Sequence, residues 1–141
     1  MSAEDNARIA RESLEAAFAC DWERLRETYA DDATMAGGAL NIRGADKLVA
    51  LWQGCHEEER DMRLEILNVV ADHDVAAVEF RFRGIVNQPL PGLPEEMYGK
   101  QLDATEVHMC RIQNGKITAV TIYGGVLESP DVPLRRVWVA E

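Results

Sequence analysis

The chain has 141 residues, of which 47% are hydrophobic and 28% charged, so it is long enough for one folded domain with its own core. Its net charge of −10 argues against a nucleic-acid partner, which needs a basic surface, and against anionic membranes. No apolar run approaches the roughly 20 residues of a membrane span, and the acidic N-terminus lacks a signal-peptide core. We therefore expect a cytoplasmic protein with no nucleic-acid or membrane partner.

The first part of the chain predicts three helices. Apolar residues recur at helical spacing from Ala7 to Phe18, and Asp21 can cap a second, short helix that carries Tyr29 on its apolar face. A short strand is expected after the turn at Asp31. A third helix follows from about Asp46 to Glu59, with an apolar stripe of Leu48, Leu51, Trp52 and Cys55.

The remainder of the chain predicts strands. Apolar residues alternate from Met62 to Val70 and again in the segment Val75–Arg83, with a turn between them at residues 72–74. The proline-rich segment 87–96 cannot continue a strand and is expected to form a loop or lid. Two further strands follow, joined by Asn114–Gly115, a strong hairpin signal because both residues tolerate a positive φ.

Helices followed by consecutive antiparallel strands predict an α+β fold, in which one curved antiparallel sheet wraps around the N-terminal helices. A sheet of this shape leaves a cavity at its open end, and such concave, mostly apolar cavities are the usual sites for small molecules. We therefore expect a small apolar ligand.

Two ionisable residues stand out on the strand before the hairpin. Side chains alternate across a strand, so Glu106 and His108 share one face with Leu102, Ala104 and Cys110. A carboxylate beside an imidazole can move a proton near neutral pH. If this face lines the cavity, Glu106 and His108 are candidate catalytic residues. Two alternatives stay open: His108 as a core histidine, and Glu106 in water if the strand parity slips by one residue.

Cofactor signals are absent from the sequence. The three cysteines Cys20, Cys55 and Cys110 are too few and too scattered for a disulfide framework, so we expect free thiols. No pair of histidines or cysteines has the spacing of a local zinc motif, although a metal site built from distant residues stays open. No glycine-rich phosphate cradle is present. We therefore expect no metal and no organic cofactor.

Short motifs follow one another in a distinctive order between residues 5 and 125. They are Asp21–Glu23, Tyr29–Thr34, Arg43–Gly44, Phe80–Gly84, Gly92–Pro94, Tyr98–Lys100 and Arg111–Ile117. In this order they resemble the nuclear transport factor 2-like superfamily, in particular its SnoaL-like polyketide cyclase and ketosteroid isomerase-like branch. The resemblance implies a cone-shaped α+β barrel, with one SnoaL-like domain over residues 1–125. The tail 126–141 would pack on that domain or on a dimer partner.

The resemblance also indicates where related enzymes carry their catalytic groups. The positions that match a catalytic acid are the segment Met35–Gly37 and Ile122, and neither holds a carboxylate here. A tyrosine donor of the related isomerase matches Ser13 or a neighbour. The pocket histidine of the cyclases matches His108. The sequence thus keeps one pocket histidine, and Glu106 is the nearby carboxylate on its face.

Further residues are expected to bind the substrate. They come from the third helix, the loop region and the inward faces of the strands, and they are Trp52, His56, Val78, Phe80, Phe82, Tyr98, Val120 and Ile122. For His56 and Tyr98 a surface position is the alternative, and for the aromatic residues a place in the core.

Two functional hypotheses follow. The first is a cofactor-independent cyclase, isomerase or lyase acting on a small apolar carbonyl or polyketide-like compound, with His108 as acid, base or oxyanion donor and Glu106 orienting it. The second is a non-catalytic ligand-binding or accessory protein. Val107, Met109, Thr121 and Tyr123 make the outer face of the last two strands too apolar for a fully hydrated sheet, which predicts a homodimer through that face.

Overall fold

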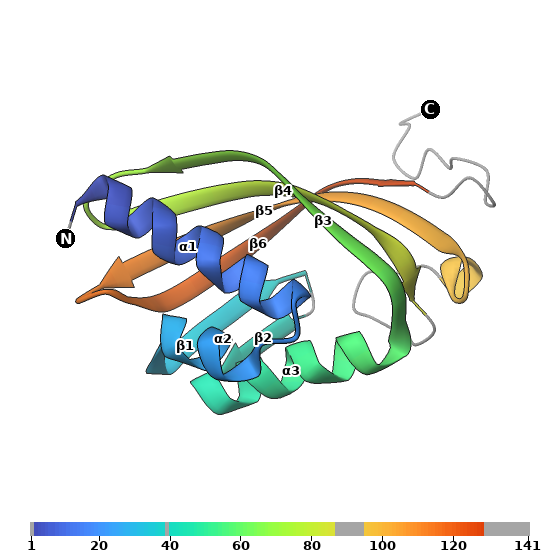
Figure 1. Ribbon diagram of the computed structural model, residues 1–141, viewed down its shortest axis with the longest axis horizontal. Coiled ribbons are helices and arrows are strands. Elements are labelled where there is room, and N and C mark those ends of the chain that lie inside the picture. The colour runs from blue at the N-terminus through green and yellow to red at the C-terminus, as the bar shows by residue number, and fades with distance from the viewer. Residues whose placement is uncertain (1, 39, 87–94, 129–141) are drawn as a thin grey trace.

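A computed structural model describes residues 2–38, 40–86 and 95–128 (Figure 1). Most of the predicted loop, residues 87–94, and most of the predicted tail, residues 129–141, lie outside the described residues. In the described part the elements are α1 (Ala3–Phe18), α2 (Trp22–Thr28), β1 (Tyr29–Gly37), β2 (Leu40–Arg43), α3 (Ala45–Glu58), β3 (Glu59–Ala71), β4 (Val75–Val86), the short 3₁₀ helix η1 (Glu95–Met97), β5 (Gln101–Gln113) and β6 (Lys116–Glu128).

Side-chain caps fix where the first two helices begin. The Ser2 hydroxyl accepts a hydrogen bond from the Asp5 backbone N–H at 3.1 Å, and the Ser2 N–H donates to the Asp5 carboxylate at 3.3 Å. This reciprocal pair is a capping box, which satisfies N–H groups that have no partner within the helix. Asp21 caps α2 as the sequence predicts, by accepting from the Arg24 N–H at 3.3 Å.

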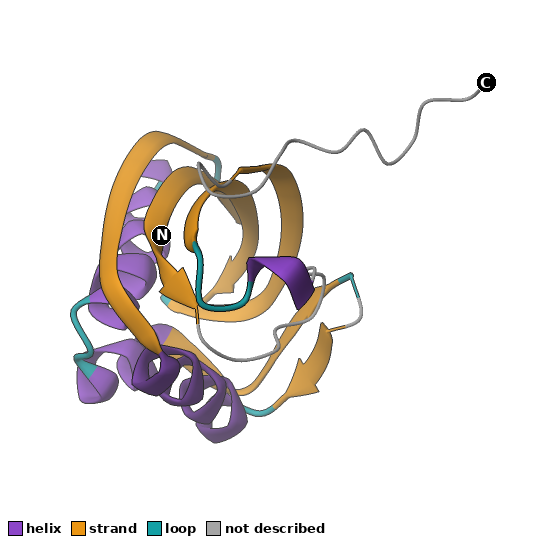
Figure 2. Ribbon diagram, turned by 90° about the vertical axis from the view of Figure 1, so that its right-hand side faces the viewer, coloured by secondary structure: helices purple, strands orange, loops and turns teal. Residues whose placement is uncertain are grey.

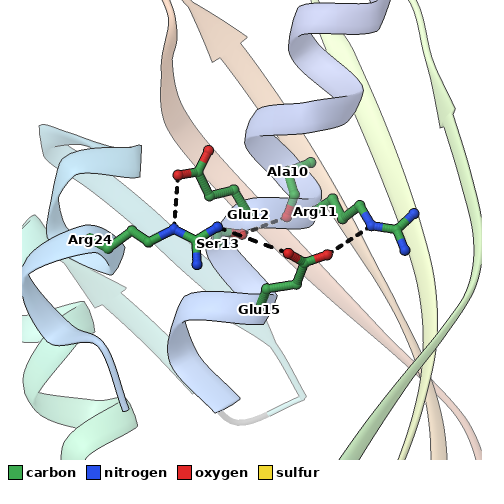
Figure 3. Close-up of polar contacts among 6 residues, drawn as sticks. All are labelled: Ala10, Arg11, Glu12, Ser13, Glu15 and Arg24. Atoms are coloured by element: carbon green, nitrogen blue, oxygen red, sulfur yellow. Dashed lines mark hydrogen bonds and ion pairs between the residues drawn. The ribbon is translucent and has the colours of Figure 1, made fainter. Parts of the chain in front are cut away.

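Ion pairs join α1 to α2 on the outside of the molecule (Figure 3). Arg24 Nε lies 2.9 Å from Glu12 Oε1, and the same guanidinium reaches Glu15, which also pairs with Arg11 at 2.8 Å. The Ser13 hydroxyl donates to the Ala10 carbonyl within α1, so it is not directed at a ligand. Such part-exposed pairs contribute at most about 1 kcal/mol each. They orient the helices more than they stabilise the fold.

The six strands form one sheet in the order β2-β1-β6-β5-β4-β3. The sheet curls around the helices, as the view turned by 90° shows (Figure 2). This confirms the predicted α+β fold with a curved sheet. One pair differs from the expected antiparallel arrangement, because β1 pairs with β6 in parallel. No hairpin dictates the relative direction of these two strands, since α3 and four strands separate them along the chain.

Two turns set the register of the long strands. Asn114 and Gly115 adopt φ values of 51° and 76°, as the predicted β5–β6 hairpin requires. In the β3–β4 turn, Asp72 Oδ1 accepts from the N–H groups of residues 74 and 75, both at 2.9 Å. The buried Asn6 amide of α1 then donates to the carbonyls of Asp72 and His73 at 3.0 and 2.9 Å. This contact fixes α1 on the concave side of the sheet.

Several boundaries differ from those expected from the sequence. Tyr29 begins β1 instead of continuing α2, and Glu59 begins β3 instead of ending the third helix. The backbone of Glu59 pairs with Val86, so β4 also runs past the predicted end at Arg83. β6 likewise continues to Glu128. In each case pairing with a neighbouring strand prevails over the local sequence preference.

Gly37 lies where β1 comes very close to β6. A Cβ atom at this residue would lie 2.7 Å from the Ile122 carbonyl oxygen and 2.8 Å from the Ile122 Cβ. We predict that Gly37→Ala lowers the free energy of unfolding by about 1–3 kcal/mol, because the two strands must separate. Urea denaturation measures the change. Gly54→Ala in α3, where a Cβ meets open space, is the matched control and should be neutral or stabilising. Equal midpoints for the two variants would contradict the close approach.

Candidate active site

A cavity of about 200 Å³ lies between the helices and the concave face of the sheet. The end of α1, the middle of α3 and all six strands contribute to its wall. The wall is apolar except at one place, where β5 supplies two ionisable side chains. The lining residues are Phe18, Met35, Gly37, Leu40, Leu51, Trp52, Cys55, Met62, Phe80, Phe82, Glu106, His108 and Ile122.

Glu106 and His108 meet on this wall. β5 pairs with β4 on one side and β6 on the other, which places His108 between Val78 and Ile122 and directs its ring inward. His108 is only 4% exposed, so the predicted side-chain direction is confirmed. Its Nε2 lies 3.8 Å from Glu106 Oε1. This separation is longer than a hydrogen bond, as is common in ligand-free sites that tighten around a substrate.

Aromatic side chains hold the His108 ring. Phe80 on β4 meets it edge to face, with ring centroids 4.8 Å apart and an interplanar angle of 89°. Trp52 of α3 is also near the ring, in a tilted arrangement at a centroid distance of 6.2 Å. Such contacts contribute about 0.5–1.5 kcal/mol each beyond the area they bury. They restrict the imidazole to one orientation in the cavity wall.

A β-bulge in β6 lies beside Glu106. Ala104 pairs with Leu127 but Glu106 pairs with Gly124, so β6 holds one extra residue between these two pairs. Bulges are frequent next to active sites because they redirect side chains. Gly124 stands directly opposite Glu106, and a Cβ there would meet open space. Room is therefore left on the β6 side of the Glu106 side chain.

Two other reactive groups are buried close to the site. Burial raises the pKa of the Cys110 thiol to about 12 and moves the pKa of the Tyr29 hydroxyl well above its ordinary value. The indole N–H of Trp52 faces that hydroxyl and lowers its pKa by a smaller amount, without reaching full hydrogen-bond geometry. Cys110 and Tyr29 therefore stay protonated near neutral pH, and Cys110 is no nucleophile.

The structure brings together six of the residues that the sequence singles out for the site. They are Trp52, Phe80, Phe82, Glu106, His108 and Ile122, and all line the cavity. Val78 and Val120, expected to contact substrate, are packed in the core instead. Both are on inward strand positions, but deeper than the cavity wall. Tyr98 follows η1, is half-buried and does not line the cavity.

His56 packs behind the cavity wall. Its ring contacts Phe18 at a centroid distance of 5.4 Å and Trp22 at 5.6 Å, and it also lies against Trp52. The sequence places His56 on the same side of its helix as Trp52, which is correct. Its ring packs within the aromatic cluster of α1, α2 and α3, however, and does not line the cavity.

Several wall residues are not identified by sequence reasoning. They are apolar or contain sulfur, and they are Phe18, Leu40, Leu51, Cys55 and Met62. Periodicity shows that Phe18, Leu51 and Cys55 belong to apolar helix faces. It does not distinguish a residue that fills the core from one that borders a cavity, because both sit on the same face.

The described part of the chain shows neither a metal-binding cluster nor a membrane-spanning helix. No group of three or more His, Cys, Asp or Glu side chains there is close enough to hold a metal ion. None of the helices within residues 2–38, 40–86 and 95–128 combines the length and apolar character of a membrane span.

Comparison with known proteins identifies the family. The sequence model of the SnoaL-like domain family matches residues 10–120 of this chain. This chain belongs to the SnoaL-like family. The resemblance seen in the sequence motifs is thereby confirmed. No curated protein matches the chain.

Solved structures share the fold at low sequence identity. A candidate SnoaL-like polyketide cyclase from a Jannaschia species has a TM-score of 0.74 and 16% identity, with 86% of each chain covered. An LEH-like epoxide hydrolase from M. tuberculosis has a TM-score of 0.70 and 15% identity over 87% of this chain and 84% of its own. A candidate ketosteroid isomerase from Kribbella flavida has a TM-score of 0.69 and 18% identity over 97% and 93%.

The half-buried His56 predicts a pH dependence of stability. Burial lowers its pKa in the folded chain, so the unfolded chain binds the proton more readily. The free energy of unfolding should therefore fall as pH drops below about 6.5, the unperturbed histidine value. Urea denaturation at several pH values measures this loss, and His56→Gln should remove part of it.

His73 provides the control for this experiment, because its side chain is exposed in the β3–β4 turn. His73→Gln should leave the acid-side loss of stability unchanged. The assignment to His56 fails if both variants have the same pH dependence as the original chain.

Proposed function

We propose that this SnoaL-like protein is a cofactor-independent acid/base enzyme, a cyclase, isomerase or lyase, that acts on a small apolar carbonyl or polyketide-like compound. The observation that carries the proposal is the juxtaposition of His108 and Glu106 on an otherwise apolar cavity wall, with Nε2 and Oε1 3.8 Å apart. Proton transfer next to a carbonyl needs one group that takes the proton and one that supports the developing enolate.

His108 carries the proton in this proposal. Its imidazole either removes a proton from the carbon next to the carbonyl or donates a hydrogen bond to the enolate oxygen. Glu106, two residues along the same strand, orients the ring. The largely apolar wall gives the site a low local dielectric, which strengthens interactions with charge that develops during the reaction. Phe80 and Trp52 keep the ring facing the cavity.

The relatives support the proposal at the level of reaction type. Structures with a similar fold include an epoxide hydrolase, a candidate polyketide cyclase and a candidate ketosteroid isomerase. At 15–20% identity these structures share a fold, and one fold hosts many functions. The choice among reactions therefore rests on the site of this chain.

A second candidate function is non-catalytic ligand binding. The observation in its favour is that Met35, Gly37 and Ile122 line the cavity. These are the positions that the resemblance matches to the catalytic acids of related enzymes. If the pair on β5 does not replace those acids, the cavity retains a ligand without transforming it.

The proposal predicts a selective loss of activity. A screen of small cyclic ketones, enones and polyketide-like esters supplies the substrate. With it, His108→Ala should lower kcat by about 10²–10⁴-fold, the usual effect of losing a proton-transfer group. Glu106→Gln should have a smaller effect, because glutamine preserves the shape of the side chain and its capacity to form a hydrogen bond. Steady-state kinetics on variants with unchanged circular dichroism provides the measurement.

His73→Ala is the matched control, since it removes an exposed histidine far along the chain from the site, and its kcat should not change. Full activity in His108→Ala would exclude the assigned role and leave the binding protein or another catalytic group.

We also propose that the chain forms a homodimer through the outer face of β5 and β6. Val107 pairs there with Tyr123, and Met109 with Thr121. Tyr123 is 57% exposed and adds an aromatic side chain to this apolar patch, and contiguous exposed apolar patches mark interaction surfaces. Charges border the patch, where Arg81 donates hydrogen bonds to Asp103. The cytoplasmic location stays a prediction of the sequence.

Light scattering at micromolar concentration tests the dimer and should give twice the chain mass. Tyr123→Lys should yield the monomer, because it places a charge in the apolar patch. Ala19→Lys is the control, because Ala19 is exposed at the C-terminal end of α1, away from the outer face of β5 and β6, and this variant should stay dimeric. A monomer mass for the unmodified chain would refute the proposed assembly.

A further inference from the structure

The charge of the cavity wall restricts what it can bind. Glu106 contributes a carboxyl group, and none of the described side chains that line the cavity is a lysine or arginine. With His108 neutral, the pair carries a net negative charge, and with His108 protonated the pair sums to zero. In neither state does it present net positive charge to an anion. The net charge of −10 on the whole chain adds to this repulsion.

The volume of the cavity sets the size of the ligand. Pockets that bury drug-sized molecules typically span about 300–1,000 Å³, whereas an engineered protein cavity of about 150 Å³ binds benzene. The cavity here, about 200 Å³, falls between these ranges. It therefore accommodates one ring with a small substituent and is too small to enclose several fused rings.

The wall also favours a ring by its composition. Phe18 lies 6.0 Å from Trp52, 6.4 Å from Phe80 and 6.2 Å from Phe82, measured between ring centroids. Aromatic groups attract one another at such distances in tilted and edge-to-face arrangements. A ring that enters the cavity meets aromatic side chains from α1, α3 and β4, with the Glu106–His108 pair on β5.

We infer that the cavity binds a single-ring organic molecule that carries one hydrogen-bonding group and no negative charge. Glu106 is the residue that rejects carboxylate analogues of this ligand. The inference rests on the proposed function in that it concerns the same site. It adds the size and charge of the substrate, and it holds equally for a ligand that is only bound.

Benzamide and benzoate test the charge, because they have nearly the same shape and differ by one negative charge. NMR titration of the full chain should show benzamide binding at millimolar concentration or below, with shifts at residues of the cavity wall. Benzoate should bind at least about tenfold more weakly, because tenfold corresponds to about 1.4 kcal/mol and unit charges a few ångströms apart repel by more than this in a protein. Glu106→Gln should reduce this difference.

Glu79→Gln provides the matched control for Glu106→Gln. Glu79 lies on the opposite face of the sheet, where it accepts a hydrogen bond from Asn68 at 3.1 Å. This variant removes one negative charge from the chain without changing the cavity. It should therefore leave the preference for benzamide over benzoate unchanged.

Naphthamide tests the size. Its second ring exceeds the volume available, so it should bind more weakly than benzamide to the unmodified chain. Phe82→Ala enlarges the cavity and should reverse this order. Phe82→Leu enlarges it less and is the second variant if the alanine substitution impairs folding.

Binding of benzoate as tight as that of benzamide would overturn the inference, as would tighter binding of naphthamide to the unmodified chain. Failure of every neutral single-ring probe to bind at millimolar concentration would also overturn it. These outcomes are separate from those of the proposed function. Loss of turnover in His108→Ala with an anionic substrate would support the proposed enzyme and refute the inference. Selective binding of benzamide by a chain that turns over no substrate would support the inference and refute the proposed enzyme.

Discussion

The backbone pairing of β5 on both of its edges decides where the chemistry of this protein can lie. β4 and β6 hold the strand along most of its length, so a shift by one residue would reverse the direction of every side chain on it. Leu102, Cys110 and Ile112 are buried in the core at 2–3% exposure, and the same alternation directs Glu106 and His108 to that side. Burial of the apolar residues thereby fixes the ionisable pair in the cavity wall.

The bulge beside Glu106 and the aromatic contacts of His108 complete this arrangement. Phe80 is both a core residue, 1% exposed, and the edge-to-face partner of the imidazole. The same packing that stabilises the sheet therefore orients the proposed catalytic group. The wall positions matched to the acids of related enzymes hold Met35, Gly37 and Ile122 instead. In our account, the proton-transfer function resides on β5 in this chain.

How much the sequence predicts depends on whether the signal is local. The Asp21 cap, the Asn114–Gly115 turn and the side-chain alternation of β5 each follow from a few neighbouring residues, and the structure confirms them. The parallel pairing of β1 with β6 depends on residues far apart in the chain and has no local signal. Tyr29 begins β1 instead of continuing α2, because it pairs with Ile117 of β6, which is far away in the chain.

In the candidate site, too, local sequence signals predict side-chain direction, whereas long-range packing decides which residues line the cavity. Alternation correctly directs Val78 and Val120 inward, but how deep each lies depends on how α1 packs on the sheet. The identity of Phe18 and Met62 as wall residues likewise requires three-dimensional packing. The family could be recognised from the order of motifs, since those motifs mark turns and strand ends.

The central claim is that His108 moves a proton to or from a carbon next to a carbonyl group. The most direct measurement follows deuterium incorporation at that carbon of a small cyclic ketone, by NMR in deuterated water, without the natural substrate being known. The account predicts that the chain accelerates this exchange and that His108→Ala abolishes the acceleration. Equal exchange rates with the original chain and with His108→Ala would contradict it.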